Sequence, residues 1–122
     1  MGGLTPQYKE EQAQCIFTHQ LTQIGYVANR SKWHIEPRPD EAHQLLFWNY
    51  YLNRKIPKKI FFGTGLLRYL SDIKAAQILK DIIRVKKSPA EKAFAQDFLD
   101  YFCKTAGLDQ SSIPEPSGAL KL

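Results

Sequence analysis

The chain has 122 residues, of which 43% are hydrophobic and 24% charged, and its formal net charge is +5. This length favours one domain that buries a core without disulfides or a structural metal, and the composition excludes a fibrous or disordered chain. Two cysteines, Cys15 and Cys103, are too few for a disulfide framework and indicate reduced thiols, so we expect a cytoplasmic protein.

The first residues lack the basic start and apolar run of a signal peptide. No apolar run approaches the ~20 residues that a membrane-spanning helix requires. We therefore expect neither a signal peptide nor a membrane among the partners of this protein.

The positive charge is concentrated in the middle of the chain. Residues 54–87 hold ten Lys or Arg and two Asp, a net charge of +8, whereas residues 1–53 carry −1 and residues 88–122 carry −2. This distribution indicates that the middle contacts something negative: nucleic acid, an acidic protein surface or the chain's own acidic segments.

Residues 6–24 are predicted to form the first helix. Thr5 and Pro6 are a typical start, because a hydroxyl caps free N–H groups and proline fits the first helical position. Gly25 is a typical stop. One apolar face recurs at helical spacing between them: Ala13, Ile16, Phe17, Leu21 and Ile24.

Residues 26–36 admit two interpretations, a short β-hairpin across the polar residues 29–32 or an irregular loop anchored by Trp33. A second helix is predicted from about Asp40 to Arg54, ended by the proline at 57. We assign its core face to Ala42, Leu45, Leu46, Trp48 and Leu52.

Residues 66–87 have helical periodicity, but the apolar face changes direction within them. Leu66 and Leu70 share one side, whereas Ala75 and Leu79 lie nearly opposite. Either one helix has two apolar faces, or two helices meet near Ser71, whose hydroxyl is a good N-cap. We favour two helices.

The sequence Ser-Pro-Ala-Glu at 88–91 is a capping box with proline at the first helical position. The helix that it starts is predicted to run to about Ala106, with Gly107 as its cap. Residues 108–122 are rich in Ser and Pro and predict a flexible tail. The expected fold class is therefore all-α, a compact bundle of four or five helices over residues 1–107, with the hairpin at 26–36 left open.

The second helix carries more aromatic residues than one core-facing stripe requires. Once its core face is assigned as above, a second row of mainly aromatic side chains remains on another side of the helix. Tyr, Phe and Arg are common at protein interfaces, so we expect this stripe to contact another protein, most simply in a two-fold homodimer. The alternative is a helix buried on all sides. The candidate interface residues are His43, Phe47, Tyr50, Tyr51 and Arg54.

The basic middle provides a second candidate surface. Residues 80, 84 and 87 are basic and lie on one helical face, which suits contacts with phosphates. The alternatives are favourable charges near a helix C-terminus and side chains that are simply solvated. No helix-turn-helix, zinc-finger or RNA-binding signature accompanies them. The candidate basic patch consists of Lys55, Lys58, Lys59, Lys80, Arg84 and Lys87.

Chemical sites are less well supported. Cys15 and His19 lie one turn apart, as in a thiol–imidazole pair or half a zinc site, but no further ligands follow at metal-binding spacing. An exposed cysteine beside a surface histidine is the simpler interpretation. We therefore expect no enzymatic activity, no metal site and no cofactor.

These patterns predict a non-enzymatic protein-binding regulator: an adaptor, antagonist or inhibitor of another protein. The aromatic helix face is predicted to form one contact, and the basic segment to engage an acidic protein surface, for example that of an enzyme. The alternative is a small DNA- or RNA-binding regulator that uses the basic helix face.

Overall fold

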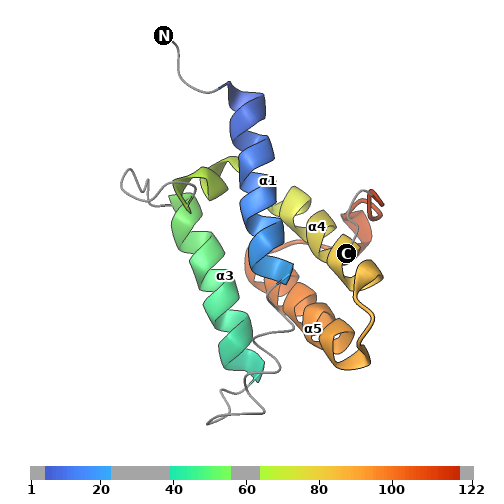
Figure 1. Cartoon of the computed structure of the whole chain (residues 1–122). Helices are drawn as coiled ribbons and strands as arrows, with labels where there is room; N and C mark the ends of the chain where they lie inside the picture. Colours follow the sequence, from blue (N-terminus) through green and yellow to red (C-terminus); the bar gives the residue numbers. More distant parts are fainter. Residues whose placement is uncertain (1–4, 23–38, 56–63, 119–122) are drawn as a thin grey trace.

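The computed structural model describes residues 5–22, 39–55 and 64–118, and within these ranges the regular structure is entirely helical (Figure 1). The fold class is thus all-α, while the hairpin considered at 26–36 lies outside the described residues. None of the described helices combines the length and the apolar character required to cross a membrane. The elements are α1 (Pro6–Thr22), α3 (Pro39–Lys55), η1 (Thr64–Tyr69), α4 (Asp72–Val85), α5 (Pro89–Ala106) and η2 (Gln110–Ser112), where η denotes a 3-10 helix.

Helix α1 begins as the sequence predicts. The Thr5 hydroxyl accepts a hydrogen bond of 3.1 Å from the backbone N–H of Tyr8, which satisfies one of the free donors of the first turn. The helix buries Ala13, Phe17 and Leu21, one residue from each successive turn of the predicted apolar face. The stop predicted at Gly25 lies outside the described residues.

The break predicted at Ser71 is confirmed, but the helix before it is of the 3-10 type. The Ser71 hydroxyl accepts a 3.2 Å hydrogen bond from the Lys74 N–H at the start of α4. In the preceding segment, the Leu70 N–H donates to the Leu67 carbonyl at 3.0 Å, and both leucine side chains are buried. Three-residue spacing of the buried residues matches the three residues per turn of a 3-10 helix.

Both predicted caps of α5 are confirmed. The Ser88 hydroxyl accepts from the Glu91 N–H at 3.4 Å, and Pro89 is the first helical residue. At the other end Gly107 has a φ of 71°, in the left-handed region where a side chain would be strained. Of the predicted core face, Phe94, Phe98 and Phe102 are buried, and Tyr101 is partly buried.

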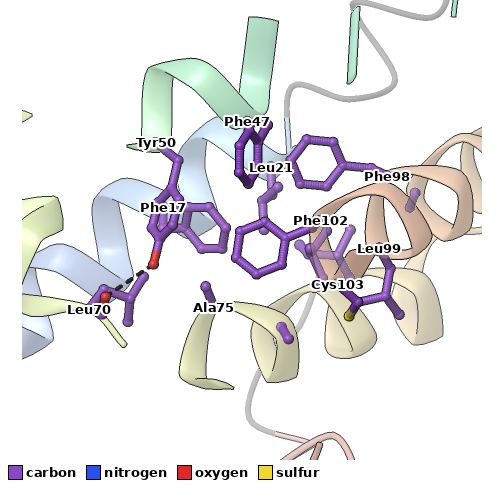
Figure 2. Packing of buried hydrophobic residues seen from close by; sticks show 14 of the residues in the cluster. Phe17, Leu21, Phe47, Tyr50, Leu70, Ala75, Phe98, Leu99, Phe102 and Cys103 are labelled. Carbon is purple, nitrogen blue, oxygen red and sulfur yellow. Dashed lines mark hydrogen bonds between the residues drawn. The ribbon is translucent and has the colours of Figure 1, made fainter. Parts of the chain in front are cut away.

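One aromatic core joins the helices (Figure 2). The ring of Tyr50 from α3 lies 4.7 Å from the Phe17 ring of α1 and 5.6 Å from the Phe102 ring of α5, measured between centroids. Phe47, one turn before Tyr50, meets the same Phe102 ring edge-on at 5.6 Å. Small residues of α4, such as Ala75, let that helix approach the rings closely.

The chain beyond α5 also belongs to the packed structure, in contrast to the flexible tail expected from residue 108 onward. Ile113 is buried in the core. The Lys80 ammonium donates to the Ile113 carbonyl at 3.1 Å, and the Gln77 side chain donates to the Glu115 carbonyl at 2.9 Å. The core therefore extends past the predicted boundary at residue 107, because one apolar side chain joins the core and two backbone carbonyls find partners on α4.

Replacing Ile113 by Ala is expected to lower the free energy of unfolding by roughly 2–4 kcal/mol, since it leaves a cavity at a fully packed position. Glu115→Ala is the matched control, because it keeps the backbone carbonyl that Gln77 contacts and removes an exposed side chain. Urea unfolding followed by circular dichroism measures both. Equal stability of Ile113→Ala and the unmodified protein would mean that the segment after α5 does not contribute to the core.

Candidate functional site

The outer face of α3 exposes three large apolar side chains. Leu45, Trp48 and Leu52 retain 70%, 47% and 46% of their accessible surface. Their spacing of three and four residues places them in one row along the helix, which we call the α3 stripe. Figure 1 shows α3 at the edge of the molecule, with the other described helices on one side of it. The row of apolar residues is thus open to a partner.

The buried and exposed faces of α3 are the reverse of those predicted from the sequence. Leu45, Trp48 and Leu52 were assigned to the core and are exposed, whereas His43, Phe47 and Tyr50 were assigned to an interface and are buried. An intermolecular contact through the latter three side chains is therefore not available in the folded chain. Leu46 lies partly buried at the border between the two faces.

The physical reason is that the polar atoms of the inner face have partners within the core. The His43 Nε2 atom lies 3.3 Å from the Phe94 carbonyl oxygen, and the His43 ring packs 4.5 Å from the Phe94 ring. The Tyr50 hydroxyl donates to the Leu70 carbonyl at 3.0 Å (Figure 2). In the described part of the chain, every buried side-chain nitrogen or oxygen has a hydrogen-bond partner. Burial of these aromatic residues thus leaves none of their polar atoms without a hydrogen-bond partner.

Trp48 is exposed, yet other rings hold it in place. Its ring meets the Tyr51 ring edge-on at 5.5 Å and the buried Phe47 ring at 5.7 Å. Tyr51, which the sequence placed in the interface, is half-buried beside the same Phe47 ring. A tryptophan already restrained in this way loses less conformational entropy when a partner covers it.

An ion pair anchors the C-terminal end of α3. The Arg54 guanidinium contacts the Asp72 carboxylate, and the guanidinium carbon Cζ lies 5.4 Å from the centre of the Tyr50 ring. The Tyr50 hydroxyl also reaches the Asp72 carboxylate at 3.3 Å. Arg54 thus acts within the chain, at the junction of α3 and α4, rather than as a free interface residue. The neighbouring Lys55 is exposed, with its ammonium 4.6 Å from the centre of the Tyr51 ring.

The structure does not present the basic residues of α4 as a row of free cations. The Lys80 ammonium is bound to the Ile113 carbonyl, and the Arg84 Nε atom lies 2.7 Å from the buried carboxylate of Asp81. Lys87, just beyond α4, is exposed. The remaining two members of the predicted patch, Lys58 and Lys59, lie outside the described residues. A phosphate contact by this face would compete with contacts that the chain already makes.

Cys15 and His19 line an open groove of about 580 Å³ between α1 and α4. Lys74, Gln77 and Asp81 contribute to the opposite wall. No group of three or more His, Cys, Asp or Glu side chains within the described ranges is arranged to hold a metal ion. The other thiol, Cys103, is buried in the core, and burial raises its pKa, so it is a poor nucleophile.

Comparisons of the chain with protein-family models, with curated proteins and with solved structures find no match in any of the three. The surfaces described above are therefore what the functional proposal rests on.

The buried phenol of Tyr50 predicts a loss of stability at alkaline pH. Burial raises the pKa of Tyr50 far above the ordinary value near 10, with the Arg54 charge opposing this shift and the Asp72 charge adding to it. The fold thus favours the neutral phenol, and the corresponding stability is complete below pH ~10 and is lost as the pH rises above that value. The melting temperature of Tyr50→Phe should accordingly fall less between pH 9 and 12 than that of the unmodified protein.

At pH 7 the same substitution is expected to cost about 1–2 kcal/mol, because it removes the hydrogen bonds to Leu70 and Asp72. Tyr8→Phe is the control, since Tyr8 is an exposed phenol whose loss should leave both the stability and its pH dependence unchanged. Thermal unfolding followed by circular dichroism tests both variants. Parallel pH profiles for all three proteins would contradict the prediction.

Proposed function

We propose that this protein is a non-enzymatic protein-binding module, acting as an adaptor, antagonist or inhibitor, and that the α3 stripe is its contact surface. The observation that carries the proposal is the exposure of Leu45, Trp48 and Leu52 in one row on a single helix. Scattered exposed apolar residues are normal on protein surfaces, whereas a continuous apolar patch marks an interaction site.

The energetics of covering the stripe are favourable. Removing the remaining exposed surface of each of these side chains contributes on the order of 1 kcal/mol or more. Trp48 occupies the centre of the row, and tryptophan is one of the residue types enriched at interface hot spots. Because neighbouring rings already restrain Trp48, little of the free energy gained by covering its surface is lost in ordering the side chain.

The geometry favours an elongated apolar partner. Anchors at spacings of three and four residues are typical of contacts between two helices or of a helix laid in a groove. The exposed cation of Lys55, at the end of α3, supports a partner with acidic residues around its apolar surface. Such peripheral charges raise the association rate and the selectivity more than the affinity.

The alternative function, binding of DNA or RNA through the basic face of α4, has less support. Two of its three residues, Lys80 and Arg84, already bind a carbonyl and a carboxylate within the chain. Nucleic-acid binding predicts an affinity that falls steeply with salt concentration, whereas an apolar contact through the α3 stripe predicts little salt dependence.

The proposal is tested with the double variant Leu45→Glu, Leu52→Glu, used as bait in parallel with the unmodified chain in nuclease-treated lysate at moderate salt. We expect the double variant to lose a protein partner that the unmodified chain retains, because two carboxylates within the contact must be desolvated. Captured proteins are identified by mass spectrometry and their affinities measured with purified material.

Ile73→Glu is the matched control. Ile73 is an exposed apolar residue of α4 with 46% of its surface accessible, so the same chemical change falls outside the α3 stripe. This control should retain the partner, and the circular dichroism spectra of both variants should match that of the unmodified chain. Retention of every partner by the double variant, or loss of all binding after nuclease treatment, would contradict the proposal.

A further inference from the structure

We infer that Lys9 of α1 and Arg68 and Tyr69 of η1 form a binding site for a phosphate group, carried either by a small phosphate monoester or by a phosphorylated side chain. Two positive charges meet there at one phenol, and neither has a carboxylate partner among the described residues. The site shares no residue with the α3 stripe, so it adds a second binding surface to the proposed function and does not depend on it.

Lys9 occupies a position on the inner face of α1. Steps of four residues lead from it to Ala13, Phe17 and Leu21, the buried residues of that helix. Side chains at this spacing share one side of a helix, and that side is packed against η1 and the core. Lys9 is accordingly partly buried, and its ammonium lies 5.0 Å from the centre of the Tyr69 ring. A cation thus stands where the pattern of this face predicts an apolar residue.

The 3-10 helix η1 brings Arg68 and Tyr69 to this cation. Leu67 and Leu70 are buried and fix one side of the three-residue repeat in the core, so the two residues between them lie on its other sides. The Arg68 Nη2 atom donates to the Tyr69 hydroxyl oxygen at 2.8 Å, and the guanidinium carbon Cζ lies 4.9 Å from the centre of the Tyr69 ring. Two cations from different helices therefore converge on one phenol.

Neither of these cations is neutralised within the described part of the chain. The ion pairs among the described residues involve other cations. The carboxylates that adjoin Lys9 in the sequence, Glu10 and Glu11, accept hydrogen bonds from glutamines one turn away on α1. Because the charges of Lys9 and Arg68 lie within 5.0 Å of one ring centre, they are no more than about one Debye length (~10 Å) apart and repel each other. A bound anion relieves this repulsion.

The charge of the cluster matches that of a phosphate group. A carboxylate neutralises only one of the two cations, whereas a phosphate monoester carries a charge of about −1.5 to −2 at pH 7. The tetrahedral oxygens of a phosphate also accept hydrogen bonds from several directions, which suits donors that come from two helices.

The hydrogen-bond donors of the cluster remain available for such a ligand. The contact with Tyr69 uses one N–H of the Arg68 guanidinium, which has five. Because the Tyr69 oxygen accepts from Arg68, its own O–H hydrogen is directed elsewhere and provides a further donor. Hydrogen bonding by Arg68 and the charge of Lys9 lower the pKa of Tyr69. The positive potential that favours the phenolate also favours a bound anion.

The test titrates the isotope-labelled full chain with inorganic phosphate, at an ionic strength held constant with chloride. The side-chain Nε–H resonance of Arg68 and the backbone amides of η1 are followed by NMR. We expect saturable shifts with a dissociation constant on the order of 1 mM, because the site is partly open to solvent. Shifts that do not saturate up to about 50 mM phosphate, or equal shifts with chloride alone, would overturn the inference.

Removal of either cation should weaken phosphate binding. Lys9→Gln and Arg68→Gln are each expected to raise the dissociation constant about tenfold, and Arg68→Lys less, because lysine keeps the charge but not the planar set of donors. Lys104→Gln is the matched control, since it removes one charge at an exposed position of α5. Equal weakening by Lys104→Gln and Lys9→Gln would show that the net charge attracts phosphate, and would overturn the site.

Tyr69→Phe tests the hydroxyl separately from the ring. The substitution keeps the aromatic face that both cations contact, and we expect it to weaken phosphate binding about threefold through loss of one donor. Tyr8→Phe is the control, because Tyr8 is an exposed phenol on the same helix as Lys9. Equal affinities of the two variants would overturn the role of Tyr69 in the site.

A comparison of ligands distinguishes the two sources of the phosphate group. A short phosphoserine peptide that binds about tenfold more tightly than inorganic phosphate would support a phosphorylated protein segment as the ligand, and equal affinities would support a small phosphate monoester. Equal binding of the unphosphorylated peptide would overturn the inference. The variant Leu45→Glu, Leu52→Glu should bind phosphate like the unmodified chain, so failure of this site and failure of the α3 stripe are observed separately.

Discussion

The arrangement of the described helices depends on one side chain, Tyr50. Its ring lies between Phe17 of α1 and Phe102 of α5, and its hydroxyl donates to the carbonyl of Leu70, the residue that follows η1. A buried hydroxyl must keep a hydrogen-bond partner, and here the partner is a backbone atom at a fixed place. The rotation of α3 about its own axis is therefore determined from within, and the outward position of the α3 stripe is a consequence of that constraint.

Local structure could be predicted from the sequence because its causes are local. The caps at Thr5, Ser71, Ser88 and Gly107 each involve groups within five residues along the chain, and all four appear as expected. Which face of α3 packs against the core could not be predicted in the same way, because its two apolar stripes are similar in composition. Distant segments determine which stripe is buried, through the carbonyls of Leu70 and Phe94 and the ring of Phe102.

The candidate site was also predictable only in part. The sequence indicated that α3 has one apolar face more than the core requires, but the residues assigned to the exposed face are the ones that pack in the core. The segment after α5 was likewise judged by its Ser and Pro content, while its contribution comes from one residue, Ile113, and from carbonyls that Lys80 and Gln77 bind. Composition describes the average of a segment and does not identify the single side chain that packs.

The short connection between α4 and α5 bears on the order in which the structure forms. Only residues 86–88 separate the two helices, and each adjoining helix end is capped by its own nearby residues. Contacts close in sequence form fastest, so this helical hairpin is suited to form first, whereas α3 reaches α5 only through residues about fifty positions apart, such as His43 and Phe94. A partner that covers the outer face of α3 holds in place a helix that docks on α5 through contacts distant in sequence, so the affinity of the partner and the stability of the folded chain are thermodynamically linked.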